Sequence, residues 1–168
     1  MKFSACTWPL LLVLAAAPAS ASGSRTAAEA DASDEPLLVY TAPLRQVTLS
    51  SDFRLADAEY LAEYDNPAAA EPSKTVRTEK TARASEEETA ELLRFIKESG
   101  FHALQEEYGA KAQERHYAYI IAVRDGDREK RVTYRSSPDA APRPEAFARA
   151  ETRILEFTQK AFASNKGE

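Results

Sequence analysis

The chain has few of the residues that carry covalent or metal chemistry. Its only cysteine, Cys6, and its only tryptophan, Trp8, both lie close to the amino terminus. The rest of the sequence therefore cannot form a disulfide or a thiolate metal site. The two histidines, His102 and His116, are not part of a metal-binding motif such as two histidines at helical spacing with a glutamate. We expect no metal ligands and a fold held by its core alone.

Motifs of nucleotide and acyl chemistry are also missing. The five glycines are scattered, so the sequence has no phosphate loop, dinucleotide fingerprint or nucleophile elbow. The acidic run at residues 86–88 is explained by the start of a helix, where carboxylates are favoured. We therefore expect no catalytic or cofactor-binding residues and a protein that is not an enzyme. An enzyme with an unrecognised site is the least favoured alternative.

One apolar run stands out, and it is short. Lys2 precedes residues 9–17, and Ala19-Ser20-Ala21 supplies the small residues that a signal peptidase reads. This pattern predicts a signal peptide over residues 1–21 and a periplasmic or secreted protein. No later run is long enough to cross a bilayer, so we expect no transmembrane segment in the mature chain. Without Lys2, 21 basic residues face 27 acidic ones, a net charge of about −6 that argues against nucleic-acid binding.

The remaining sequence divides into a leader, one domain and a tail. Residues 22–35 are rich in alanine, serine and acids without apolar periodicity, which predicts a disordered leader. Residues 36–163 form the predicted domain and residues 164–168 a tail. Within the domain, residues 37–40, 44–49 and 74–82 are predicted strands. Residues 53–64 are compatible with a strand or with a helix, because alternation gives way to alanine, leucine and glutamate.

Residues 115–135 predict a β-hairpin. Tyr117, Tyr119 and Ile121 alternate onto one face, and Val132 and Tyr134 do so beyond the turn. A turn centred on Asp125-Gly126 would place Tyr119 opposite Val132. A loop of Gly126-Asp127 would shift the pairing by two residues and keep the same faces, whereas a three-residue loop would put the apolar residues on opposite faces.

Two helices flank this hairpin. Ser85 and Glu88 form a capping box for a helix over residues 85–99, which Gly100 would end in a left-handed conformation. Pro144 begins a second helix, whose inner face repeats at three and four residues: Phe147, Ala150, Ile154, Phe157 and Ala161. The order strands, helix, hairpin, helix predicts an α+β fold. We expect a two-layer sandwich with a mostly antiparallel sheet and both helices on one face.

The stretch from Glu91 to Ile154 resembles the emfourin family of small bacterial metalloprotease inhibitors. The resemblance rests on the segments ELLRFIKESGF, ALQEEYGA, HYAYIIAV, DG, RVTYRSSP and PEAFARAETRI, taken in that order. It implies a small α+β domain and, as an alternative function, inhibition of thermolysin-type metalloproteases. None of the matching residues is an inhibitory residue that can be carried over.

Basic residues gather in the predicted strands. The hairpin and residues 74–83 are each about +3 within an acidic chain. By parity, one hairpin face is turned from the helices and carries an apolar strip rimmed by arginines. The candidate partner-binding residues there are His116, Ile120, Arg124, Arg131, Thr133 and Arg135.

The sequence therefore predicts a non-enzymatic binding domain, with an acidic protein or an anionic glycan as the expected partner. A solvated sheet that resists aggregation is the alternative interpretation of the same charges. If this face does not bind, the loops at residues 66–73 and 136–143 are the next candidates.

Export is testable by mass. We expect the exported protein to begin near Ser22, because residues 1–21 have the order of a cleaved signal peptide. Intact-mass spectrometry of the periplasmic or secreted fraction measures the amino terminus directly. A full-length mass that retains Met1 in the soluble cytosolic fraction would show that the prediction is wrong.

Overall fold

The computed structural model describes residues 36–63 and 73–165. Two compact units divide the chain, Met1–Ala30 and Asp31–Glu168, and every described residue belongs to the second. The predicted signal peptide and leader lie outside the described residues, as does the loop at residues 66–73 apart from Ser73.

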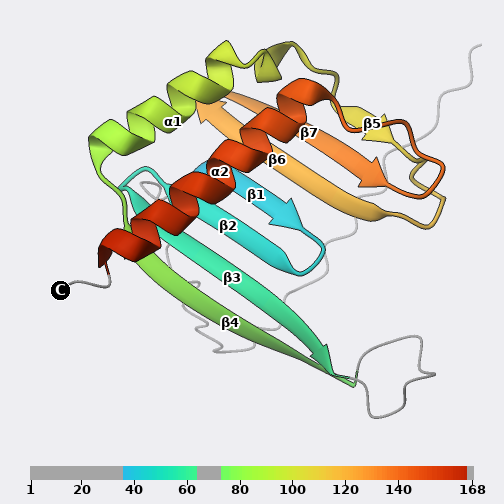
Figure 1. Ribbon diagram of the computed structural model, residues 1–168, viewed down its shortest axis with the longest axis horizontal. Helices are drawn as coiled ribbons and strands as arrows, with labels where there is room; N and C mark the ends of the chain where they lie inside the picture. The colour runs from blue at the N-terminus through green and yellow to red at the C-terminus, as the bar shows by residue number, and fades with distance from the viewer. Residues whose placement is uncertain (1–35, 64–72, 166–168) are drawn as a thin grey trace, which may run out of the picture. The chain divides into compact units, whose positions relative to one another are not determined.

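The described chain forms one seven-stranded sheet and two α-helices, which confirms the predicted α+β class (Figure 1). The strands are β1 (Pro36–Ala42), β2 (Arg45–Ser50), β3 (Arg54–Glu63), β4 (Lys74–Arg83), β5 (Glu107–Gly109), β6 (Tyr117–Asp125) and β7 (Arg128–Ser136). Their order in the sheet is β4-β3-β2-β1-β6-β7-β5. All pairings are antiparallel except that of β5 with β7.

The segment that the sequence left open between strand and helix is strand β3. It pairs with β2 on one side and with β4 on the other. Two neighbouring ladders satisfy its backbone groups, and Leu55 is fully buried. Pairing on both sides therefore overrides the helix propensity of its alanine, leucine and glutamate residues.

The hairpin keeps the predicted faces but not the favoured register. Tyr119 lies opposite Tyr134, and Ile121 lies opposite Val132. The turn is therefore Gly126-Asp127, with Asp125 paired to Arg128. Gly126 has φ of +62°, whereas Asp127 is not among the residues with positive φ. A two-residue turn with positive φ only at its first central position favours glycine at that position. The Gly126-Asp127 turn has glycine there, whereas the Asp125-Gly126 turn would have aspartate.

Two details of this region differ from the sequence analysis. Tyr117, predicted to face the core, is 62% exposed, because it pairs with Ser136 at the end of the ladder. Strand β5 was not predicted: its three residues pair in parallel with the outer side of β7. Gly109 permits this contact, since a Cβ at that position would lie 2.0 Å from the backbone oxygen of Arg135.

Helix α1 (Glu86–Glu98) has the predicted capping box. The Ser85 hydroxyl accepts from the backbone N–H of Glu88, and the Glu88 carboxylate accepts from the backbone N–H of Ser85. Gly100 adopts φ of +86°, as predicted for the end of this helix, and leads into the short 3₁₀ helix η1 (Phe101–Ala103). Helix α2 (Glu145–Ser164) follows Pro144 and ends one residue inside the predicted tail.

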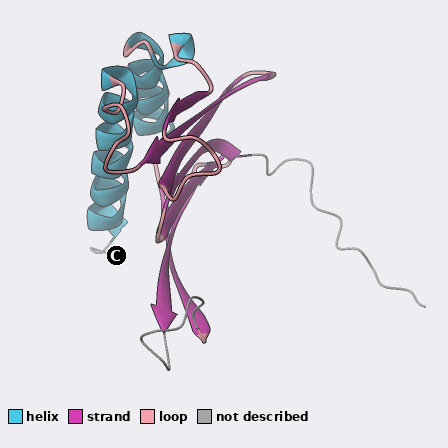
Figure 2. Ribbon diagram, turned by 90° about the vertical axis from the view of Figure 1, so that its right-hand side faces the viewer, coloured by secondary structure: helices cyan, strands magenta, loops and turns pink. Residues whose placement is uncertain are grey.

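Figure 2 shows α1 and α2 on the same side of the strands. Alternate residues of the central strands meet apolar residues of both helices in one core. Its large, fully buried members are Leu38, Val47, Leu49, Leu55, Leu92, Ile96, Phe101, Ile121, Val132, Phe147 and Ile154. Ion pairs join the helices at their outer edges, Arg153 to Glu91 at 2.7 Å and Lys160 to Glu88 at 2.9 Å.

Core and cap variants test this packing. We expect Ile96→Ala to lower the free energy of unfolding by about 2–5 kcal/mol, because its side chain is fully buried. Ser85→Ala should remove about 1 kcal/mol through the lost cap. Arg94→Ala, on the exposed side of α1, is the control and should stay within about 0.5 kcal/mol of the wild type. Chemical denaturation measures all three, and equal midpoints for Ile96→Ala and Arg94→Ala would contradict the packing.

Candidate functional site

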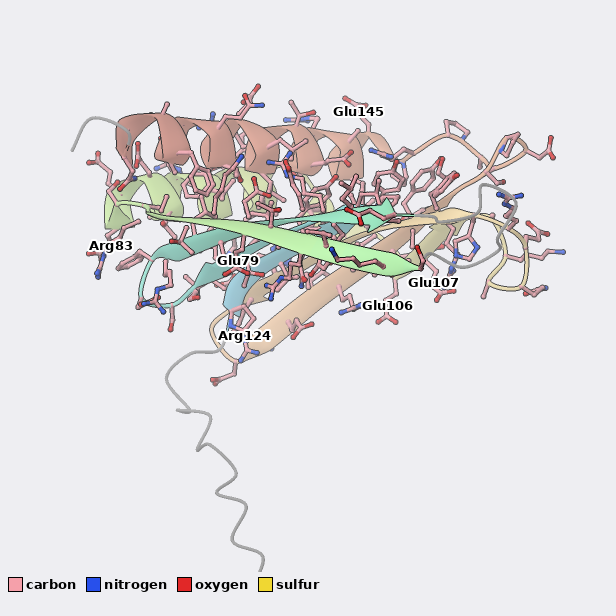
Figure 3. The ribbon with its side chains drawn as sticks, turned by 90° about the horizontal axis from the view of Figure 1, so that it is seen from below. Glu79, Arg83, Glu106, Glu107, Arg124 and Glu145 are labelled. Carbon is pink, nitrogen blue, oxygen red and sulfur yellow. The ribbon has the colours of Figure 1, made fainter. Side chains whose placement is uncertain are left out.

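The predicted partner-binding residues lie on β6 and β7, with one exception. Ile120 pairs with Thr133, and Arg124 pairs with Glu129. Arg131 and Arg135 occupy alternate positions of β7 on the same face. We call this side the outer face, because its side chains alternate with those packed in the core. Figure 3 shows Arg124, Glu107, Glu79 and Arg83 on the opposite side of the sheet from the helices.

His116 does not belong to this face. It precedes the first residue of β6, and its Nδ1 lies 2.6 Å from the backbone oxygen of Glu114. The two-residue shift of the hairpin pairs Arg135 with Ala118 and leaves His116 beyond the ladder. The structure therefore brings together five of the six predicted residues and leaves His116 outside the sheet.

The centre of the outer face is apolar. Val39 of β1 pairs with Ala122 of β6, and Ile120 follows on the same side. Ala122 is buried, whereas Val39 and Ile120 are half-buried. A cavity of about 220 Å³ opens here, lined by Pro36, Val39, Ala122, Arg124, Glu129 and Arg131. The predicted apolar strip with an arginine rim is therefore present and includes a concave region.

Acidic neighbours reduce the positive charge of this rim. The Arg135 guanidinium lies 2.7 Å from the Glu107 carboxylate, which β5 places beside it. This hydrogen bond and the positive charge of Arg135 hold the pKa of Glu107 below its usual value. Arg124 lies 3.9 Å from Glu129. Arg131 is exposed and has no ion-pair partner within residues 36–63 and 73–165, so it is the arginine most available to a ligand.

A second polar cluster lies on the helix side of the sheet, and the sequence analysis missed it. The buried Tyr40 hydroxyl donates to Glu151 Oε1 at 2.7 Å, and Arg143 forms an ion pair with the same carboxylate. The Arg143 guanidinium also stacks over the Tyr119 ring, 4.3 Å from its centroid. These residues come from β1, β6, α2 and the loop before α2. No short-range sequence pattern connects them. The signal that the sequence does carry is Glu151, a charged residue beside the apolar face of α2.

Next to this cluster, Arg45 holds Asp57 in a bidentate pair at 2.8 and 2.7 Å. Two cavities of about 670 and 570 Å³ share Arg45 and Glu59 in their walls. Leu44 and Leu61 line the larger cavity and are 58% and 62% exposed. The helix side thus also carries concave surface beside a partly buried ion pair.

Each charged group of these two clusters has an opposite partner: Glu151 is paired with Arg143, and Asp57 with Arg45. Burial, followed by the hydrogen bond to Glu151, raises the pKa of the Tyr40 hydroxyl well above its usual value and keeps it protonated. Among the described residues, no three His, Cys, Asp or Glu side chains are placed to hold a metal ion. In the same part of the chain, no helix is both long and apolar enough to cross a membrane.

No protein-family model matches the chain, and no curated protein matches it either. The resemblance to emfourin therefore stays a prediction from the sequence.

The Tyr40–Glu151 hydrogen bond is testable through stability. We expect Tyr40→Phe to lower the free energy of unfolding by about 1–3 kcal/mol at neutral pH, because Glu151 loses a buried donor. The native state holds the Tyr40 proton more tightly than the unfolded state does. Above about pH 10 the unfolded phenol ionises first, so this stabilisation should shrink as the pH rises.

Tyr117→Phe is the matched control, because its ring is exposed. Denaturation of the wild type and both variants at neutral and alkaline pH gives the comparison. A Tyr40→Phe effect no larger than that of Tyr117→Phe would contradict a structural role for the buried hydrogen bond.

Proposed function

We propose that this protein is an exported, non-enzymatic binding domain whose outer face holds an acidic segment of a partner protein. In this proposal the domain is a two-layer α+β sandwich. The helices cover one sheet face, and the partner binds the other face, which no described helix covers. The arginines of β6 and β7 supply charge, and the strip around Ile120 supplies apolar contact.

The observation that carries the proposal is the composition of the outer face around its cavity. Val39 and Ala122 form an apolar floor, and Arg131 stands beside them without an ion-pair partner among the described residues. An apolar centre with a polar rim is the layout of a protein interface. A planar guanidinium pairs with a carboxylate through two parallel hydrogen bonds, which favours an acidic partner.

Arg135 has a different part in this proposal. It is only 14% exposed and is held by Glu107 at 2.7 Å. Reversing its charge would place two acids side by side and disturb the docking of β5 on β7. Arg131 is therefore the residue whose substitution separates binding from folding.

We expect Arg131→Glu to weaken binding of an acidic peptide at least about tenfold, since it replaces a favourable charge with a repulsive one. The probe is a fluorescent polyglutamate peptide, titrated by anisotropy against the purified protein. Wild-type binding should weaken as salt rises, because the charges are exposed to solvent. Heparin, titrated in parallel, measures whether an anionic glycan binds in place of the peptide.

Arg149→Glu on α2 is the matched control, because Arg149 is exposed and its substitution changes the net charge equally on the helix side. Its affinity should remain close to that of the wild type. Equal affinities for Arg131→Glu and Arg149→Glu, with both proteins folded, would remove the outer face as the binding surface. Tight binding of heparin without binding of the peptide would reject a protein partner in favour of a glycan.

A further inference from the structure

Strand β4 is a long edge of the sheet. It pairs with β3 over all ten of its residues, and no described strand lies on its other side (Figure 1). Apart from Val76 and Ala82, its residues are exposed. The opposite edge, β5, has only three residues. An exposed strand of this length offers a row of backbone donors and acceptors to another chain.

The backbone hydrogen bonds show which residues of β4 point outward. Ala84, just past β4, donates its N–H to the backbone oxygen of Phe53 at 3.0 Å. Along an antiparallel strand, the backbone N–H and C=O groups of successive residues point alternately toward and away from the neighbouring strand. The backbone groups of Arg77, Glu79, Thr81 and Arg83 therefore point away from β3. The backbone oxygen of Arg83 indeed accepts a hydrogen bond from the Asn165 side chain, outside the ladder, at 3.2 Å.

Space for the side chains of an added strand exists on the helix side. The cavity of about 570 Å³ between α2 and the β3–β4 region is lined by Lys80 of β4 and by Phe162 and Ala163 of α2. Side chains alternate along a strand, so every second residue of a strand added to β4 would point toward this side. Phe162 offers such a residue an apolar contact, whereas the charges of the lining balance: Arg45 and Lys80 against Asp57 and Glu59.

Charge decides which kind of strand can be added. The basic residues of β4 are Lys74, Arg77, Lys80 and Arg83, against the single acid Glu79. Arg77 is paired with Glu79 and Lys74 with Glu63, whereas Lys80 and Arg83 have no ion-pair partner among the described residues. The pairing of two β4 strands from two copies would bring together two segments that each carry four cations against one acid, and this excess of like charge is repulsive. The same cations would attract carboxylates on an incoming strand, so the charge that prevents self-association also selects the partner.

We propose that the exposed edge of β4 accepts an extended, acidic segment of a partner protein as an additional antiparallel or parallel strand. Backbone hydrogen bonds from Arg77, Glu79 and Thr81 hold the segment. Carboxylates of the segment meet the cations of β4, and one side chain enters the cavity beside Phe162. This is the mode of recognition in which a peptide extends a sheet. It goes beyond the proposed outer-face site, because β4 and β7 lie on opposite sides of β1 in the sheet order.

The first experiment measures backbone protection. The probe is a short synthetic peptide that alternates valine and glutamate, and its control replaces glutamate with lysine. We expect the acidic peptide to slow amide hydrogen exchange at Arg77, Glu79 and Thr81, as measured by nuclear magnetic resonance, and the basic peptide to leave it unchanged. Unchanged exchange at these three amides with saturating acidic peptide would overturn the proposal. Equal protection by the two peptides would overturn the charge selection.

The second experiment uses a matched pair of variants. Thr81→Pro removes an outward N–H while leaving the ladder to β3 intact, and proline is tolerated at such edge positions. Thr81→Ala loses the same side chain but keeps the N–H. We expect Thr81→Pro to bind the acidic peptide about tenfold more weakly than Thr81→Ala. Equal affinities for the two folded variants would overturn the proposal.

The wild-type exchange measurement decides the question by itself if Thr81→Pro does not fold. Arg149→Glu on α2, titrated with the same valine–glutamate peptide, should bind within about twofold of the wild type, because Arg149 lies neither on β4 nor on the outer face. A large loss in Arg131→Glu together with unchanged exchange in β4 would place the peptide on the outer face. The two proposals can therefore fail separately.

Discussion

The ladder between β1 and β6 is the contact on which the rest of the sheet depends. It joins the meander of β1 to β4 with the hairpin of β6 and β7, through the pairs from Leu38 with Val123 to Thr41 with Ile120. These residues are far apart in the chain, so this ladder is the long-range step of folding. Its core-side residues, Leu38, Tyr40, Ile121 and Val123, lie beneath the helices at the middle of the sheet. Without this ladder, the β1–β4 meander and the β6–β7 hairpin would each expose apolar residues that are now buried in the common core.

The same ladder determines the character of both sides of the sheet. On the outer face it places Val39 beside Ala122, and this pair forms the floor of the small cavity near Arg131. On the helix side it carries Tyr40 to Glu151, where a buried carboxylate is balanced by Arg143. A buried acid is tolerated only where donors and opposite charge surround it. The polar cluster and the apolar strip are thus two sides of one central strand pair.

Edges of this sheet differ in their chemistry because the strands that form them differ in length and pairing. At β7, the short strand β5 covers the backbone and brings Glu107 to Arg135, so this end is partly neutralised. At β4, no described strand covers the backbone, and basic side chains line the strand, although Arg77 is paired with Glu79 and Lys74 with Glu63. The net charge of each segment does not reveal this contrast, since the hairpin and residues 74–83 are each about +3 in the sequence.

The sequence by itself determined what depends on neighbours along the chain. The capping box of α1, the left-handed Gly100, the two helices and the buried face of the hairpin follow from local hydrogen bonding and side-chain periodicity. Tertiary structure decided whatever needs a distant partner. It made β3 a strand, added β5 and exposed Tyr117. It also brought Tyr40, Arg143 and Glu151 together. The turn register belongs to the same group, because both registers kept the apolar face inward and only the backbone conformation at Gly126 and Asp127 distinguished them.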